Sequence, residues 1–308
     1  MLLINFSLKV NMKISEKKTA FYLCPQPENK TFLPNKPSID LINWLSNEIK
    51  NSEVIVLAET KSIENWCISN DIRFISKLNF VSKEYQKPCT SKMFECIFKE
   101  KNNYSIQVFM NDDLILNKRF TALIDFANNI KSDFLISGKR LNIDRTFDFN
   151  IFGAHQHWGT DYFIFKLPFP LAIKDYIYAR FAWDSHILSN VCRNRKKLGI
   201  ITIDATDYFK PLHPNHNYSW GNKGNKSSRP NYTHPTIFRN LRKTSVFEWY
   251  NLKSFDWILQ SHDSTCNTPI INRKSLTRRR KDYVYRCRFF VNWFRVYLKN
   301  IISFTKFI

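Results

Sequence analysis

Glycine is scarce in this sequence, with 6 residues among 308. Two glycine-rich signatures that hold phosphates through backbone amides, the GxGxxG turn and the P-loop with its lysine, are absent from the sequence. Their absence excludes the common nucleotide sites that are built from glycine loops. A nucleotide bound by this chain must therefore be held by side chains and a metal ion.

Cysteine patterns and long apolar runs are also lacking. The 7 cysteines are odd in number and form no CxxC pair, which argues against a disulfide framework or a zinc site and favours a reducing compartment. The sequence has no uninterrupted run of about 18 apolar residues, which a membrane-spanning helix requires. The segment Met1–Phe6 is too short and wrongly flanked for a signal peptide. We therefore expect a cytoplasmic protein with buried thiols.

Positive charge, by contrast, is abundant. The formal net charge is +21, while hydrophobic and aromatic fractions of 44% and 16% are typical of a folded protein. Residues 271–308 contain 11 basic residues and one acidic residue. A basic segment of this kind indicates an anionic partner, either a membrane surface or nucleic acid.

Apolar strands and amphipathic helices alternate through the first half of the chain. The predicted strands are 19–24, 53–59, 73–75 and a run through 108–110, and the predicted helices are 38–50, 63–70, 87–99 and 120–130. This alternation predicts parallel pairing, so the expected fold class is α/β with a mostly parallel central sheet flanked by helices. Ser38 is the expected N-cap of its helix. The predicted organisation is a lead-in at 1–18, one domain at 19–266 and a tail at 267–308.

The polar triplet Asn111-Asp112-Asp113 interrupts an apolar run that extends from Val108 to Leu116. The first part of the run predicts a buried strand, and the triplet then lies at its end. Two carboxylates at a strand end offer hard oxygen ligands suited to Mg²⁺ or Mn²⁺ carrying a diphosphate. A simple turn explains the same residues, because asparagine and aspartate favour turns.

Other polar residues lie at the ends of neighbouring elements. Parallel strands bring Glu59 and Asn111 to the same sheet edge as Pro25, and open α/β sheets bind ligands there. Lys87 begins a predicted helix and could contact a phosphate there, although a lysine in such a position is more often only solvated. The alternating pair His155 and His157 fits an exposed or hydrogen-bonded pair better than a metal site.

The second half of the chain adds four further motifs in order. These are the strand Phe134–Ile136 with Gly138-Lys139-Arg140 at its end, the run Gly159-Thr160-Asp161-Tyr162-Phe163, the segment Arg180-Phe181-Ala182-Trp183-Asp184 within a helix predicted over 174–189, and His213-Pro214-Asn215-His216-Asn217-Tyr218. Together with the polar triplet they resemble a glycosyltransferase-like family of the nucleotide-diphospho-sugar transferase superfamily, of the GT-A type, over about residues 19–260. The chain departs from the family pattern at Ala179, Asn217 and Trp220, which replace a glycine, an aspartate and a third histidine.

The resemblance implies a nucleotide-diphosphate sugar donor, a hydroxyl acceptor and Mn²⁺ or Mg²⁺. Asp113 is then the main metal ligand, with His213 or His216 completing the shell, and Asp184 or Asp161 is the catalytic base. The implied donor-binding residues are Pro25, Glu59, Lys87, Asn111, Asp112, Arg140 and Arg180. Two alternatives stay open, a nucleotidyltransferase on the same fold and a non-enzymatic basic nucleic-acid-binding protein. The concentration of charge in one tail speaks against the second.

The tail has its own pattern. From Lys281 onward a helix would place Arg288, Asn292, Arg295 and Lys299 on one stripe and aromatic and aliphatic side chains over the rest. A basic stripe beside an aromatic face is typical of a helix that lies flat on an anionic membrane surface. A last helix packed on the domain is the alternative. The loop at 215–231 is rich in Asn, Gly, Ser and Lys and is expected to cover the site.

Overall fold

The computed structural model describes residues 18–25, 27, 33–81, 87–143, 155–167, 173–179, 183–214, 252, 255–260 and 276–278. Several predictions concern residues outside these ranges. They are the roles of Arg180 and His216, the covering loop at 215–231, and the tail helix from Lys281.

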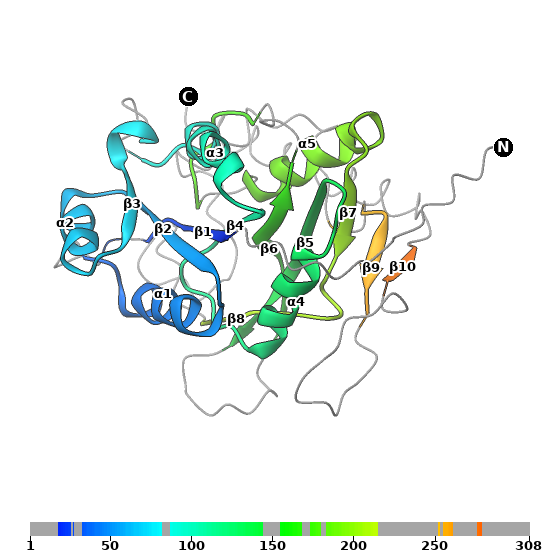
Figure 1. Cartoon of the computed structure of the whole chain (residues 1–308), viewed down its shortest axis with the longest axis horizontal. Helices are drawn as coiled ribbons and strands as arrows, with labels where there is room; N and C mark the ends of the chain where they lie inside the picture. Colours follow the sequence, from blue (N-terminus) through cyan, green and yellow to red (C-terminus); the bar gives the residue numbers. More distant parts are fainter. Residues whose placement is uncertain are drawn as a thin grey trace, which may run out of the picture.

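The first half of the described chain alternates strands and helices as predicted (Figure 1). Its elements are β1 (Thr19–Leu23), α1 (Lys36–Glu48), β2 (Ser52–Ala58), α2 (Lys61–Ser69), β3 (Arg73–Ser76), α3 (Thr90–Lys99), β4 (Ile106–Met110) and α4 (Lys118–Asn128), with 3₁₀ turns η1 (Lys77–Asn79) and η2 (Lys101–Asn103). The second half contains β5 (Phe134–Ile143), β6 (His155–Lys166), α5 (Trp183–Leu198), β7 (Ile201–Asp204), β8 (Leu212–Pro214), β9 (Trp257–Leu259) and β10 (Leu276–Arg278).

All of these strands belong to one mixed sheet. Its order is β10-β9-β7-β5-β6-β4-β1-β2-β3. Strand β8 also pairs with β5, along residues 141–143, after the part of β5 that pairs with β7. Pairing is parallel except that β6 runs antiparallel to β4 and β5, and β10 to β9. The predicted fold class, a mostly parallel central sheet flanked by helices, is confirmed. The strand Leu276–Arg278 lies beyond the predicted domain limit at residue 266 and still pairs with the sheet.

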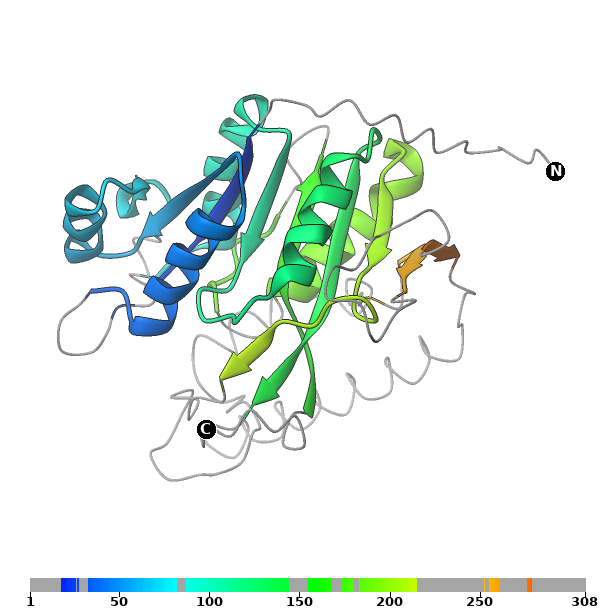
Figure 2. The ribbon, with the colours of Figure 1, turned by 60° about the horizontal axis from the view of Figure 1, so that its bottom comes forward.

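Helices cover both faces of the sheet, and each face has its own apolar core. One core joins α1, α2 and α4 to the sheet and includes Phe21 and Leu23, while the other joins α3 and α5 to it and includes Ala20 and Tyr22. Successive side chains of a strand point to opposite faces, so one apolar strand serves both cores. Figure 2 shows α1 and α4 lying across the same face of the sheet.

The predicted starts of two helices are wrong. The N-cap of α1 is Asn35, whose side chain accepts a hydrogen bond from the Ser38 amide at 3.0 Å. Ser38 is thus three residues inside the cap position and is fully buried. The helix predicted over 174–189 begins only at Trp183, and Ala179 before it has a left-handed φ of 56°. Residues 174–179 therefore lie outside this helix, and Arg180 is outside the described residues.

Strand β5 does not end at Gly138, as the basic pair after it suggested, but continues to Ile143. Its pairing with β6 shifts register between Ser137 and Lys139. A Cβ atom on Gly138 would lie 2.1 Å from the Tyr162 hydroxyl, so only glycine fits this close approach. The glycine marks an irregularity inside the strand, and the strand beyond it reaches the site.

The described helices include none long and apolar enough to cross a membrane. The cysteines within the described ranges are all buried and free, as expected for structural thiols, and they are Cys24, Cys67, Cys89, Cys96 and Cys192.

Candidate functional site

The polar triplet lies where the chain switches direction across the sheet. From β1 the chain passes through α1 to β2 on one side, and β4 pairs with the other side of β1. The last residue of β1, Leu23, is in register with Val56 of β2 and Met110 of β4. The register confirms that the strand ends at Pro25, Glu59 and Asn111 share one edge. Ligands of open α/β sheets bind in the crevice at such a switch point.

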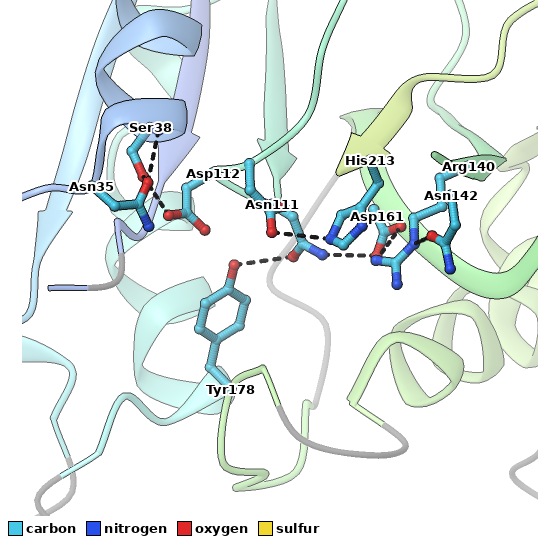
Figure 3. Close-up of polar contacts among 10 residues, drawn as sticks. Asn35, Ser38, Asn111, Asp112, Arg140, Asn142, Asp161, Tyr178 and His213 are labelled. Atoms are coloured by element: carbon cyan, nitrogen blue, oxygen red, sulfur yellow. Dashed lines mark hydrogen bonds and ion pairs between the residues drawn. The ribbon is translucent and has the colours of Figure 1, made fainter. Parts of the chain in front are cut away.

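Asn111 is held in one orientation by three hydrogen bonds. Its backbone amide donates to the Asp161 carbonyl at 2.8 Å, and its side-chain Nδ2 donates to Asp161 Oδ1 at 2.7 Å. The Tyr178 hydroxyl donates to Asn111 Oδ1 at 3.1 Å (Figure 3). These contacts fix the first residue of the turn that carries both carboxylates.

Asp112 ties the end of β4 to the first turn of α1. The Ser38 hydroxyl lies 2.6 Å from Asp112 Oδ2 and 2.8 Å from Asn35 Oδ1. Asp112 is 5% exposed, and a helix N-terminus favours a negative charge beside it. Asp112 therefore connects the end of β4 to the start of α1, and its contact with a donor stays a prediction.

Asp113 meets His213, which lies on β8 and is 2% exposed. Strand β8 pairs with the far end of β5, where His213 is in register with Asn142. The distance from His213 Nε2 to Asp113 Oδ2 is 3.0 Å. The structure thus brings together two of the three predicted metal ligands, and the third, His216, lies outside the described residues.

The Asp113 and His213 side chains fit a divalent ion. Neighbouring ligands of an octahedral ion with bonds of about 2.1 Å lie roughly 3 Å apart, which matches the 3.0 Å between Oδ2 and Nε2. Carboxylate oxygen and imidazole nitrogen are both ligands of such ions. Within the described ranges no group of three His, Cys, Asp or Glu side chains is clustered for a metal. The remaining positions would then fall to phosphate and water oxygens, as is common for Mg²⁺.

A buried ion pair supports this turn from the other side. Arg140 Nη1 of β5 lies 2.8 Å from Asp161 Oδ2 of β6, and the two side chains are 6% and 7% exposed. Arg140 Nε also donates to Asn142 Oδ1 at 2.9 Å. Burial raises the pKa of Asp161, and the nearby Arg140 and His213 oppose that shift. Because Oδ1 is hydrogen-bonded to Asn111 and Oδ2 is ion-paired with Arg140, Asp161 is better suited to positioning than to proton abstraction.

Asp184 lies in the first turn of α5, next to the same strand. Its Oδ2 accepts hydrogen bonds from the Thr160 amide at 3.3 Å and from the Thr160 hydroxyl at 3.5 Å. Burial raises the pKa of Asp184, and the charge of Asp161 adds to the effect, while backbone hydrogen bonds oppose it. A carboxylate with a raised pKa is a better proton acceptor near neutral pH.

Glu59 and Lys87, both predicted to contact the donor, pair with each other at the end of β2. The distance from Lys87 Nζ to Glu59 Oε1 is 3.4 Å. Between this pair and Asp112 lies Cys24, whose pKa is raised by burial and then by the charges of Glu59 and Asp112. Pro25 follows it and is buried. The edge is therefore polar from β2 across to β5.

Sequence reasoning missed four residues of this site. They are Asn35, Ser38, Asn142 and Tyr178. An asparagine shortly before a proline is a recognisable N-cap signal, so Asn35 was open to prediction. The contacts of Ser38, Asn142 and Tyr178 depend on residues distant in the sequence, and no local pattern marks them.

No protein-family model and no curated protein matches this sequence. Similar solved structures include glucosyl-3-phosphoglycerate synthase from Mycobacterium tuberculosis with Mn²⁺, uridine-diphosphate and glucosyl-3-phosphoglycerate, at 16% identity and a TM-score of 0.35 over 65% of this chain and 73% of that chain. A mycobacterial protein is similar at 13% identity and a TM-score of 0.40, over 65% and 68% of the two chains. CMP:2-keto-3-deoxy-manno-octonic acid synthetase with CTP is similar at 12% identity and a TM-score of 0.34, over 62% and 91%. These likenesses concern the fold, and the function proposed below depends on the site.

Proposed function

We propose that this protein is a metal-assisted glycosyltransferase that moves a sugar from a nucleotide-diphosphate donor to a hydroxyl acceptor. The observation that carries the proposal is the pair Asp113 and His213, with ligand atoms 3.0 Å apart at the carboxyl end of β4. The pair lies beside the switch point of the sheet, where α/β folds bind nucleotides. The motifs that resemble the GT-A family supply the choice of donor.

The metal, Mn²⁺ or Mg²⁺, would be held by Asp113 and His213. When bound, such an ion stabilises the negative charge that develops on a departing diphosphate. Metal binding and the present close contact between Asp113 Oδ2 and His213 Nε2 are alternatives, because Nε2 offers either a proton or a lone pair. Asn111, Asp161 and Arg140 then act by holding the turn in place.

The acceptor hydroxyl needs a base within hydrogen-bond reach. Of the two predicted candidates, Asp184 fits this role better, because Asp161 is paired with the buried cation Arg140. The raised pKa of Asp184 matches a base that works near neutral pH. Arg180, three residues before α5, is proposed to contact the donor phosphates.

The acceptor is proposed to lie at an anionic membrane surface. The support is the charge of residues 271–308, where 11 basic residues accompany many aromatic ones. A protein held at a surface meets lipid-linked acceptors at a raised effective concentration. Glycans and other hydroxyl acceptors fit the same chemistry.

The decisive experiment compares nucleotide binding with and without Mn²⁺ in the wild type and in Asp113→Asn. We expect Mn²⁺-dependent binding of a nucleoside diphosphate, such as UDP, to weaken at least about tenfold in the variant, a loss of at least about 1.4 kcal/mol. Asp125→Asn is the matched control, because Asp125 is an exposed carboxylate on α4. Thermal shift reads out binding, since a ligand of the folded state raises its stability.

Equal binding by Asp113→Asn and the wild type would refute the assignment of Asp113. Product analysis separates the remaining possibilities. A sugar phosphate and a nucleoside triphosphate converted to a nucleotide sugar would indicate a nucleotidyltransferase instead. Tight nucleic-acid binding with a steep salt dependence would indicate the non-enzymatic alternative.

A further inference from the structure

Tyr178, which fixes Asn111, belongs to an irregular segment at residues 173–179, named here the strap. The strap passes between the start of α3 and the first turns of α5. The Tyr178 ring packs against Phe109 and Trp183, with centroids 5.6 and 5.0 Å away, so its hydroxyl has little freedom to leave Asn111 while the strap stays in place. The position of Asn111 therefore depends on what holds the strap.

On the α3 side the strap is held by backbone hydrogen bonds. The Thr90 amide donates to the Tyr176 carbonyl at 2.8 Å, and the Tyr178 amide donates to the Pro88 carbonyl at 2.9 Å. The Thr90 hydroxyl lies 3.1 Å from the Lys174 carbonyl. These contacts do not change with pH, since none of the atoms titrates in the ordinary range.

On the α5 side the strap is held by the imidazole of His186. The Lys174 amide donates to His186 Nε2 at 3.0 Å, and the Tyr176 ring lies 4.9 Å from the imidazole. His186 is 4% exposed. An imidazole nitrogen that accepts from an amide must carry a lone pair, so this contact exists only in the form with Nε2 unprotonated. Protonation of Nε2 would bring its N–H against the N–H of Lys174 in a buried position, which is unfavourable because neither group could then accept the hydrogen bond.

We propose that His186 is a positioning residue for the site, acting through the strap on Tyr178 and Asn111. The neutral imidazole fastens the strap, the strap holds the Tyr178 hydroxyl on Asn111, and Asn111 sets the turn that carries Asp113. Uptake of a proton by His186 releases this chain of contacts. The proposal builds on the proposed function, because it assigns His186 a role at that same site.

Several titratable residues lie on the elements around His186. They include Lys174, Asp175 and Tyr176 of the strap, Cys89 before α3, Asp184 in its own helix and Asp161 of β6. Asp175 lies 3.4 Å from the Ser91 hydroxyl, and Asp184 accepts from Thr160. Asp175 and Asp184 thus each have a hydrogen-bond partner other than His186.

The test uses full-length protein and three variants. His186→Phe keeps a ring against Tyr176 but has no acceptor, His186→Gln keeps an acceptor that does not titrate, and Tyr178→Phe removes only the hydroxyl. Amide hydrogen exchange, corrected for its intrinsic pH dependence, is measured in the strap and in residues 111–116. The measurements are made at about pH 7.5 and about pH 5, on either side of the proton uptake of an imidazole in water.

We expect His186→Phe to exchange at least about tenfold faster than the wild type in both segments near pH 7.5, because local opening sets the exchange rate. The wild type should gain this faster exchange near pH 5, and His186→Gln should stay protected at both values. Tyr178→Phe should loosen only residues 111–116. Unchanged exchange in His186→Phe, or a loosened strap with residues 111–116 still protected, overturns the proposal.

A second readout is the binding of Mn²⁺ and UDP near pH 7.5. We expect about three- to tenfold weaker binding in Tyr178→Phe and His186→Phe, the loss typical of one hydrogen bond, and recovery in His186→Gln. If the wild type binds neither Mn²⁺ nor UDP, the proposed function fails, and the exchange experiment still decides the role of His186. If the wild type binds both and the two phenylalanine variants bind equally well, the role of His186 is refuted while the proposed function stands.

Discussion

Replacing Arg140 by methionine removes the counter-ion of a buried carboxylate. Arg140 Nη1 and Asp161 Oδ2 lie 2.8 Å apart, with side chains 6% and 7% exposed. Methionine keeps most of the apolar stem, so the main loss is electrostatic. Removing one partner of a buried pair costs about 3–5 kcal/mol. We expect the free energy of unfolding, measured by urea denaturation near neutral pH, to fall by about this amount.

The pH dependence of the stability provides a second, independent test of this prediction. In the folded protein burial raises the pKa of Asp161 even with Arg140 present, and removal of Arg140 raises it further. A carboxyl whose pKa is raised on folding contributes most stability below its unfolded pKa, and that contribution is lost as pH rises through the folded pKa. The free energy of unfolding of Arg140→Met should therefore approach that of the wild type as pH falls from neutral toward the pKa range of an ordinary carboxyl group.

The control is Lys99→Met, which breaks an exposed pair with Glu95. Those two charged groups lie 3.4 Å apart with side chains 71% and 65% exposed. An exposed pair contributes about 0.2–1 kcal/mol, so the control should lose no more than that. A loss in Arg140→Met no larger than in the control, or one independent of pH, would refute the assignment of a buried ion pair to the site.

Three further predictions test other parts of the molecule. Gly138→Ala should lower the free energy of unfolding by about 1–3 kcal/mol through overpacking against the Tyr162 hydroxyl, and Tyr162→Phe should restore part of the loss in a double-variant urea series. Asp184→Asn should lower kcat by at least about a hundredfold and leave donor affinity near that of the wild type, and an unchanged kcat would exclude it as the base. Truncation after Arg280 keeps β10 and should abolish flotation with anionic vesicles, whereas retained flotation would show that residues 281–308 are not the membrane contact.

Much of the fold follows from short-range patterns. The alternation of apolar runs with amphipathic segments predicted each strand and helix between β1 and α4 to within a few residues, because parallel strands buried on both faces are continuously apolar. The same reasoning predicted that Pro25, Glu59 and Asn111 share a sheet edge. It failed at Gly138 and at Lys174, since the extension of β5 depends on the close approach of Tyr162 and the strap depends on contacts with α3.

The candidate site divides in the same way. The sequence by itself determined the acidic turn at residues 111–113, because two carboxylates after an apolar strand are visible without any partner. Only the tertiary structure decided what those residues touch. The pairing of β8 with the C-terminal end of β5 brings His213 into contact with Asp113. The first turn of α1 brings the Ser38 hydroxyl into hydrogen-bond contact with Asp112. The physical reason is that local patterns fix the backbone of each element, whereas side-chain contacts between elements depend on the register and packing of the whole sheet.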